Sequence, residues 1–202
     1  ENQKILNDRY TLSKVLRKKS QARSKEESSW LDSKFREYKI KEKNSLESKV
    51  LELKKRMDII PISIALAQAA KESGWGTSRF ALEGNAIFGQ WTWTGTGIAP
   101  LNRDEKQSHK VLRFPILRAS VKAYKNNLNT HKGYKEFREK RFLLRKKKKT
   151  VSGLKLISTL DKYAGTGKEY TKILVKIIEQ NSLVDFEDVT LANTVVKKEL
   201  NL

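Results

Sequence analysis

The segment Ile62–Gly76, ISIALAQAAKESGWG, constrains the fold of this chain more than any other part of it. Its first nine residues are apolar at all but two positions, and a helix that is hydrophobic on nearly every face belongs in a protein core. Pro61 is suited to a first helical turn, and Gly74 and Gly76 favour the left-handed turn that closes a helix. The pattern predicts a buried helix whose last turn carries one carboxylate, Glu72.

Glu72 is the candidate proton donor of this segment. Burial and the negative end of a helix both disfavour a charged carboxylate, so both raise its pKa, as a general acid requires. Position alone is weak evidence, because a glutamate in a last helical turn is usually a solvated residue. Gln68 lies one turn earlier on the same face, so we expect the two polar groups to point the same way out of the buried helix. Trp75 is suited to stacking on a sugar ring or to shielding the carboxyl group from water.

Several separated blocks of the chain resemble the glucosaminidase domain of glycoside hydrolase family 73, and within it the Bax-type glucosaminidase proteins of Gram-negative bacteria. In chain order the blocks are IPISIALAQAAKESGWGTSRFALEGNAIFG, VLRFPILRASVKAYKNNLNTHKGY and LDKYAGTGKEYTKILVKII. The resemblance implies a lysozyme-like fold and hydrolysis of the glycan strand of peptidoglycan, with Glu72 as the matched catalytic acid. It also implies a periplasmic or cell-envelope location.

The resemblance implies further site residues. The family uses a tyrosine near the C-terminal end of the domain, and both Tyr163 and Tyr170 lie in the matching block. The segment GNAIFG matches the part of the family that lines the cleft opposite the acid. Because sugar rings stack on aromatic side chains, we expect aromatic walls along this cleft. The candidate substrate-binding residues are Gln68, Trp75, Asn85, Phe88, Gly89, Trp91, Trp93, Phe114 and Tyr124.

The second catalytic group is less defined by the sequence. Many family members carry a second acidic residue on a β-hairpin downstream of the FG pair. In this chain Asp104 and Glu105 are the carboxylates of that region, neither aligns with the family, and Glu105 is the nominee for activating water. Assistance by the 2-acetamido group of the substrate remains open, since substrate-assisted glycosidases do without a second carboxylate. No metal or organic cofactor is needed for this chemistry.

The remaining pattern predicts a mostly helical α+β protein. Apolar residues at spacings of three, four and seven favour amphipathic helices over a charged extension, residues 1–57. Alternating aromatic and β-branched residues with intervening glycines predict a small β-hairpin lobe over residues 90–114. We expect a lysozyme-like glucosaminidase domain over residues 58–180 and a C-terminal tail over residues 181–202.

Composition limits the other possibilities. The chain lacks cysteine, its two histidines are not spaced as metal ligands, and no nucleotide-binding glycine motif occurs. The net charge of +20 attracts polyanions, but the lysines are scattered as on a solvated surface and no nucleic-acid-binding motif appears. We therefore expect peptidoglycan strands as the partner, no specific nucleic acid, and a monomer.

The sequence also bears on membrane spans, on processing and on alternative functions. No apolar stretch is long enough to span a bilayer. The chain begins at Glu1 rather than methionine, so we expect that a signal or anchor has been removed. A muramidase or lytic transglycosylase also needs a glutamate at the end of a buried helix, and a non-catalytic wall-binding scaffold would keep the same cleft.

Overall fold

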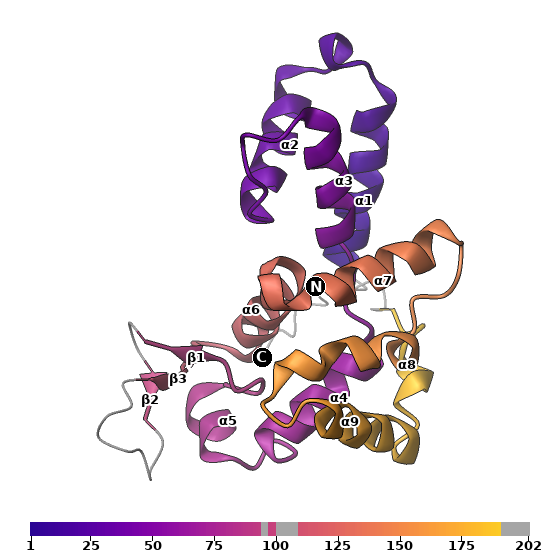
Figure 1. Ribbon diagram of the computed structural model, residues 1–202. Helices are drawn as coiled ribbons and strands as arrows, with labels where there is room; N and C mark the ends of the chain where they lie inside the picture. Colours follow the sequence, from indigo (N-terminus) through magenta and orange to yellow (C-terminus); the bar gives the residue numbers. More distant parts are fainter. Residues whose placement is uncertain (94–96, 100–108, 191–202) are drawn as a thin grey trace, which may run out of the picture.

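The computed structural model describes residues 1–93, 97–99 and 109–190, and it is mostly helical with one small antiparallel sheet (Figure 1). The predicted α+β, lysozyme-like fold class is confirmed. The helices are α1 (Asn2–Arg17), α2 (Lys25–Glu37), α3 (Leu46–Arg56), α4 (Ile62–Ser73), α5 (Arg79–Gly84), α6 (Leu117–Thr130), α7 (Lys135–Lys146), α8 (Gly153–Leu156) and α9 (Lys168–Gln180). Short 3-10 helices are η1 (Ser20–Ala22), η2 (Lys132–Tyr134), η3 (Ile157–Tyr163) and η4 (Leu183–Phe186). None of the described helices is long and apolar enough to cross a membrane.

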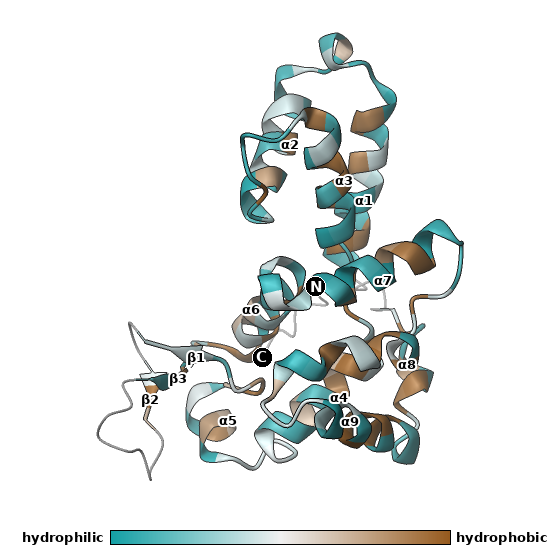
Figure 2. Ribbon diagram, in the orientation of Figure 1, coloured by the Kyte–Doolittle hydropathy of each residue, from teal (hydrophilic) through white to brown (hydrophobic). Residues whose placement is uncertain are grey.

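Helices α1, α2 and α3 lie beside one another at one end of the molecule (Figure 1). Hydrophilic residues predominate on them, interrupted at intervals by hydrophobic ones (Figure 2). These apolar residues meet in a cluster of their own, because amphipathic helices turn their apolar stripes toward each other. The cluster consists of Ile5, Leu12, Leu31, Phe35, Tyr38, Ile40, Leu53 and Met57.

Helix α4 runs through the body of the molecule as the sequence predicts. Pro61 is its N-cap, and Gly74 ends it with a left-handed φ of +57°. Ile64 and Ala67 have no exposed surface, and α4 packs against α8, α9 and η4. The surrounding core is therefore built around the helix that carries Glu72.

The sheet is small and lies beside α5 and α6 (Figure 1). Strands β1 (Trp91–Thr92), β2 (Gly97–Ile98) and β3 (Lys110–Leu112) pair in the order β1-β3-β2, with both pairs antiparallel. Val111 on β3 is opposite Trp91 on one side and Ile98 on the other. The aromatic residue that opens β1 is thus held by pairing with a buried strand residue.

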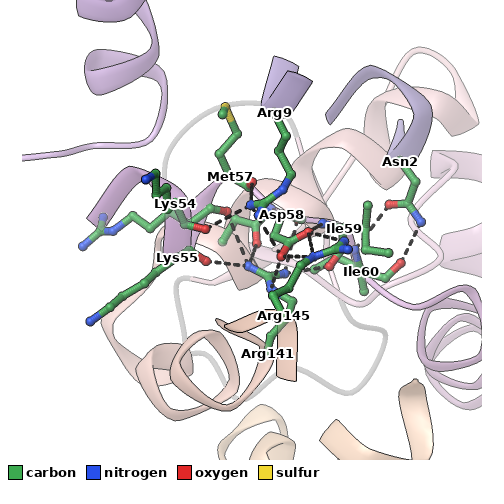
Figure 3. A network of polar contacts seen from close by, with 12 residues as sticks. Asn2, Arg9, Lys54, Lys55, Met57, Asp58, Ile59, Ile60, Arg141 and Arg145 are labelled. Carbon is green, nitrogen blue, oxygen red and sulfur yellow. Dashed lines mark hydrogen bonds and ion pairs between the residues drawn. The ribbon is translucent and has the colours of Figure 1, made fainter. Parts of the chain in front are cut away.

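A buried aspartate joins the N-terminal helices to the body (Figure 3). Asp58, in the link between α3 and α4, is 1% exposed. Arg145 of α7 donates to both of its carboxylate oxygens, at 2.9 and 2.8 Å, and Arg9 of α1 lies 3.5 Å away. Arg141, fully buried on α7, donates to the carbonyl of Ile59 at 2.7 Å. One carboxylate therefore holds cations from two separate elements.

The electrostatics of this junction favour a charged aspartate. Burial by itself would raise the pKa of Asp58, but the hydrogen bond from Arg145 and the charges of Arg141 and Arg9 outweigh it and hold the pKa below its ordinary value. Burial lowers the pKa of Arg141 to about 10, which leaves it charged at neutral pH. We call Asp58, Arg9, Arg141 and Arg145 the junction cluster.

The described residues after α9 pack on the body. Leu183 of η4 is buried against α9 side chains, and the Glu187 carboxylate accepts hydrogen bonds from the Ser63 hydroxyl and from the backbone N–H of Gly153, the latter at 2.6 Å. The beginnings of α4 and α8 meet at this point, where Gly153 has no side chain. An added β carbon would lie 2.1 Å from Ser63 Oγ.

Gly153→Ala is therefore expected to destabilise the protein by about 1–3 kcal/mol, because overfilling a packed site forces its neighbours to move. Denaturant unfolding followed by circular dichroism measures the change. Gly165→Ala is the matched control, since an added β carbon there meets nothing within 4 Å. Equal stabilities of the two variants would show that the close approach at Gly153 is unimportant.

Candidate active site

Glu72 lies in the last turn of α4, half-buried, with each carboxylate oxygen facing a different element. Oε1 accepts a hydrogen bond from the Tyr170 hydroxyl of α9 at 2.8 Å. Oε2 faces the loop after α5, where a β carbon added to Gly89 would lie 3.4 Å from it. Gly89 has a φ of +58°, which favours glycine, so the backbone can pass close to the carboxyl group.

The electrostatic setting of Glu72 is that of a proton donor. Burial raises the pKa of its carboxyl group, and the hydrogen bond from Tyr170 and the charge of Lys71 offset only part of this effect. The result is a pKa above the ordinary value of 4.5. A carboxyl group with a raised pKa keeps its proton to higher pH, and a protonated carboxyl group can give its proton to a leaving group.

Behind Glu72, a chain of side-chain hydrogen bonds runs into the core. The Tyr124 hydroxyl of α6 donates to Gln68 Oε1 at 2.7 Å. Gln68 Nε2 in turn donates to the Tyr170 hydroxyl oxygen at 2.9 Å, and Tyr170 donates to Glu72. We call these four residues the relay.

Stacked aromatic rings hold the relay in place. Tyr163 lies parallel to Tyr170, with ring centroids 5.6 Å apart, and its hydroxyl donates to the carbonyl oxygen of Phe88 at 3.1 Å. Phe88 stacks on Tyr124 with centroids 3.8 Å apart. Of the two candidate tyrosines, Tyr170 is hydrogen-bonded to the acid, whereas Tyr163 is hydrogen-bonded to the loop that leads to Gly89.

Four of the predicted substrate-binding residues are buried. Gln68 is 0% exposed, and both ends of its amide are bonded to tyrosines. It shares a helical face with Glu72, as the pattern predicts, because the Tyr170 hydroxyl is bonded to both side chains. The other three are Tyr124, Phe88 and Phe114, at 1%, 3% and 8% exposed. Phe88 packs against the core rather than offering an open stacking face, because its ring lies on Tyr124. Gln68, Phe88 and Tyr124 therefore support the site from behind. Phe114 packs instead with Ala86 and Val111.

The three predicted tryptophans are exposed. Trp75, Trp91 and Trp93 are 61%, 57% and 68% exposed, which is unusual for such large apolar rings. Trp75 follows Gly74 in a left-handed conformation of its own, with a φ of +57°, and its exposure fits stacking better than shielding of Glu72. The Trp91 ring stacks on His109 with centroids 4.1 Å apart and meets Trp93 edge to face.

Asn85 has a structural task that its motif did not reveal. It ends α5 with a φ of +50°, and its Nδ2 donates to the carbonyl oxygen of Phe114 at 3.0 Å. This bond ties the end of α5 to the segment that follows β3. Asp104 and Glu105, the candidates for a second carboxylate, lie outside the described residues. In the part of the chain that is described, no three metal-binding side chains gather.

The comparison with known families gives the class of protein. A glucosaminidase model, described as mannosyl-glycoprotein endo-beta-N-acetylglucosaminidase, matches residues 47–183, and the chain therefore belongs to this family. Family membership confirms the resemblance seen in the sequence.

A curated relative gives a more particular likeness. The chain is similar to Protein bax of Escherichia coli (strain K12), with 37% identity over 129 residues, which are 64% of this chain and 46% of that protein. The chain thus spans about half the length of this relative. No solved structure matches the chain.

Proposed function

We propose that this protein is a peptidoglycan hydrolase that cleaves the β-1,4 bond on the reducing side of N-acetylglucosamine in the glycan strand. The observation that carries the proposal is the carboxyl group of Glu72, with a raised pKa, at the end of a buried helix and 2.8 Å from the Tyr170 hydroxyl. Membership of the glucosaminidase family favours this bond over the muramidase and transglycosylase alternatives.

In the proposed mechanism Glu72 is the general acid. Its neutral carboxyl group protonates the glycosidic oxygen as it leaves, while positive charge develops on the sugar ring. Once the proton has gone, the Tyr170 hydroxyl stabilises the carboxylate through the bond to Oε1. Tyr163, stacked on Tyr170 and bonded to the loop at Phe88, keeps that tyrosine aligned.

The groups around the acid would bind the glycan. The exposed faces of Trp75, Trp91 and Trp93 are proposed to stack on sugar rings, because apolar sugar faces and indoles are complementary. Glu105 remains the proposed group for activating water, with the substrate's acetamido group as the alternative. The net charge of +20 suits a polymer that carries carboxylates on its stem peptides. We propose a monomer that acts in the periplasm or cell envelope.

Identification of the new chain ends tests the proposal. Purified peptidoglycan is digested with the protein, the products are reduced, and their ends are identified by mass spectrometry, with a Glu72→Gln digest as the control. N-Acetylglucosamine ends that are absent from the control are the expected result. N-Acetylmuramic or anhydro-muramic ends would overturn the choice of bond, and binding to the polymer without any product would overturn the hydrolase.

A further inference from the structure

Gln68 and Tyr124 are two buried polar residues that the proposed reaction does not use directly. Neither reaches solvent, and neither can touch a glycan. A buried amide or hydroxyl is retained only with hydrogen-bond partners, since leaving it unsatisfied is unfavourable. Gln68 has a tyrosine at each end of its amide, and one of these tyrosines is bonded to Glu72.

In the relay, the donor and the acceptor of each hydrogen bond follow from those of the bond between Tyr124 and Gln68. Gln68 Oε1 can only accept, so the Tyr124 hydroxyl donates to it. The NH₂ group then faces Tyr170 and donates to its hydroxyl oxygen. The single hydroxyl hydrogen of Tyr170 is thereby left for Glu72 Oε1. In this direction the relay delivers a donor to the acid and favours its ionised form.

The opposite direction of the relay is possible only with a neutral acid. If the amide is turned over, Tyr170 donates to Gln68 Oε1, and Glu72 must be protonated to donate to Tyr170. Gln68 Nε2 then donates to the Tyr124 oxygen, which leaves the Tyr124 hydrogen without the acceptor it has now. Tyr124 lies among Phe88, Leu128 and other core residues, so that loss is unfavourable. The Tyr124 hydroxyl therefore biases the relay toward the first direction.

We propose that Tyr124 and Gln68 are positioning residues that fix the direction of the Tyr170 hydrogen bond and so set the pH range over which Glu72 holds its proton. This inference rests on the proposed role of Glu72 as the acid. The titratable groups that face Glu72 are Tyr170 of α9, Tyr163 of η3, Tyr134 of η2 and Lys71 of its own helix. Burial raises the pKa of all three tyrosines, so they stay neutral donors across the working range.

Tyr124→Phe tests the relay with the smallest change in shape. Removing the hydroxyl removes the bias against the reversed direction, so the neutral form of Glu72 gains and its pKa rises. An acid that acts when protonated loses activity as pH rises through its pKa. The alkaline limb of the kcat/KM profile is therefore expected to move upward by roughly one pH unit, the scale of one hydrogen bond to a charged group.

Two further variants separate the relay from simple packing. Gln68→Met removes both polar atoms of the amide and is expected to move the alkaline limb in the same direction. The double variant with Tyr124→Phe should move it no further than the larger single shift, because both act through one chain. Tyr38→Phe, which removes a buried hydroxyl among α1–α3, is the matched control and should leave the profile in place. A loss of activity by the same factor at every pH would overturn the proposal.

A direct titration distinguishes failure of the relay from failure of the proposed function. Carbon-13 NMR of labelled glutamate carboxyl groups reports the pKa of Glu72 without turnover, and the Glu72→Gln spectrum identifies its resonance. An upward shift of this pKa in Tyr124→Phe supports the relay even if no N-acetylglucosamine ends are formed. An unchanged pKa overturns the relay even if glycan cleavage proceeds as proposed.

Discussion

Glu72→Gln is expected to lower kcat/KM for glycan cleavage by about 10²- to 10⁴-fold, the usual contribution of a general acid. Glutamine has the same shape, and its carbonyl oxygen can still accept from Tyr170, so the site should stay assembled while it loses its proton. Release of soluble muropeptides from purified peptidoglycan measures the rate. Glu83→Gln, an exposed glutamate on α5, is the matched control and should cleave at the wild-type rate. A Glu72→Gln variant with normal turnover would contradict the proposed mechanism.

Although Glu72→Gln is expected to lower activity, it is not expected to lower stability. A carboxyl group whose folded pKa is raised contributes stability that is complete below its ordinary pKa of 4.5 and is lost as pH rises through the folded value. At pH 7 a half-buried carboxylate is therefore unfavourable, and the neutral amide of Glu72→Gln should unfold at the wild-type temperature or above it. Thermal unfolding at pH 4 and pH 7 checks the sign, since any advantage of the variant should appear only at the higher pH.

Asp58→Asn is expected to cause the largest loss of stability, about 3–5 kcal/mol, because it leaves the buried Arg141 and two partly exposed arginines without their counter-charge. Arg141 has no exposed surface, and its Nε has no hydrogen-bond partner, so the carboxylate 4.0 Å away is its electrostatic compensation. Urea unfolding measures the change. Glu139→Gln is the matched control, since its ion pair with Lys55 is partly exposed and should contribute about 1 kcal/mol or less.

The pH dependence of the Asp58 effect has a defined sign. Its folded pKa is lowered, so the stability it contributes is present above its ordinary pKa of 3.8 and is lost as pH falls through the folded value. The difference between the wild type and Asp58→Asn should therefore be full at pH 6 and shrink in strong acid. A difference that is independent of pH down to pH 2 would mean that the junction cluster acts through shape rather than charge.

The parts of the fold that the sequence predicts are those with short-range signals. The all-round apolar pattern of α4, with Pro61 before it and Gly74 after it, fixes both its burial and its ends. Apolar spacings in residues 1–57 predict helices there, and the structure has three. The glycine-rich aromatic stretch predicts paired strands. The sheet also has a third strand, because residues 97–98 and β1 both pair with β3, one on each side.

The relay and the junction cluster could not be predicted in the same way. Gln68 and Glu72 share one helical face, but periodicity does not reveal that Tyr124 and Tyr170, distant in sequence, cover Gln68 and leave Glu72 half-open. Asp58 gives no local signal either, since its partners lie on α1 and α7. Both features depend on residues that only the complete fold brings together.

In this protein, the unit that the family model matches and the unit held together by the junction cluster have different bounds. The unit shared with the glucosaminidase family begins at residue 47, inside α3, whereas the buried charge that anchors α7 also holds Arg9 of α1. A chain cut at the family boundary would keep the proposed acid but uncover Leu53 and Met57 and release one of the arginines around Asp58. The helices of residues 1–45 thus lie outside the family match, yet they contribute side chains to the same buried junction.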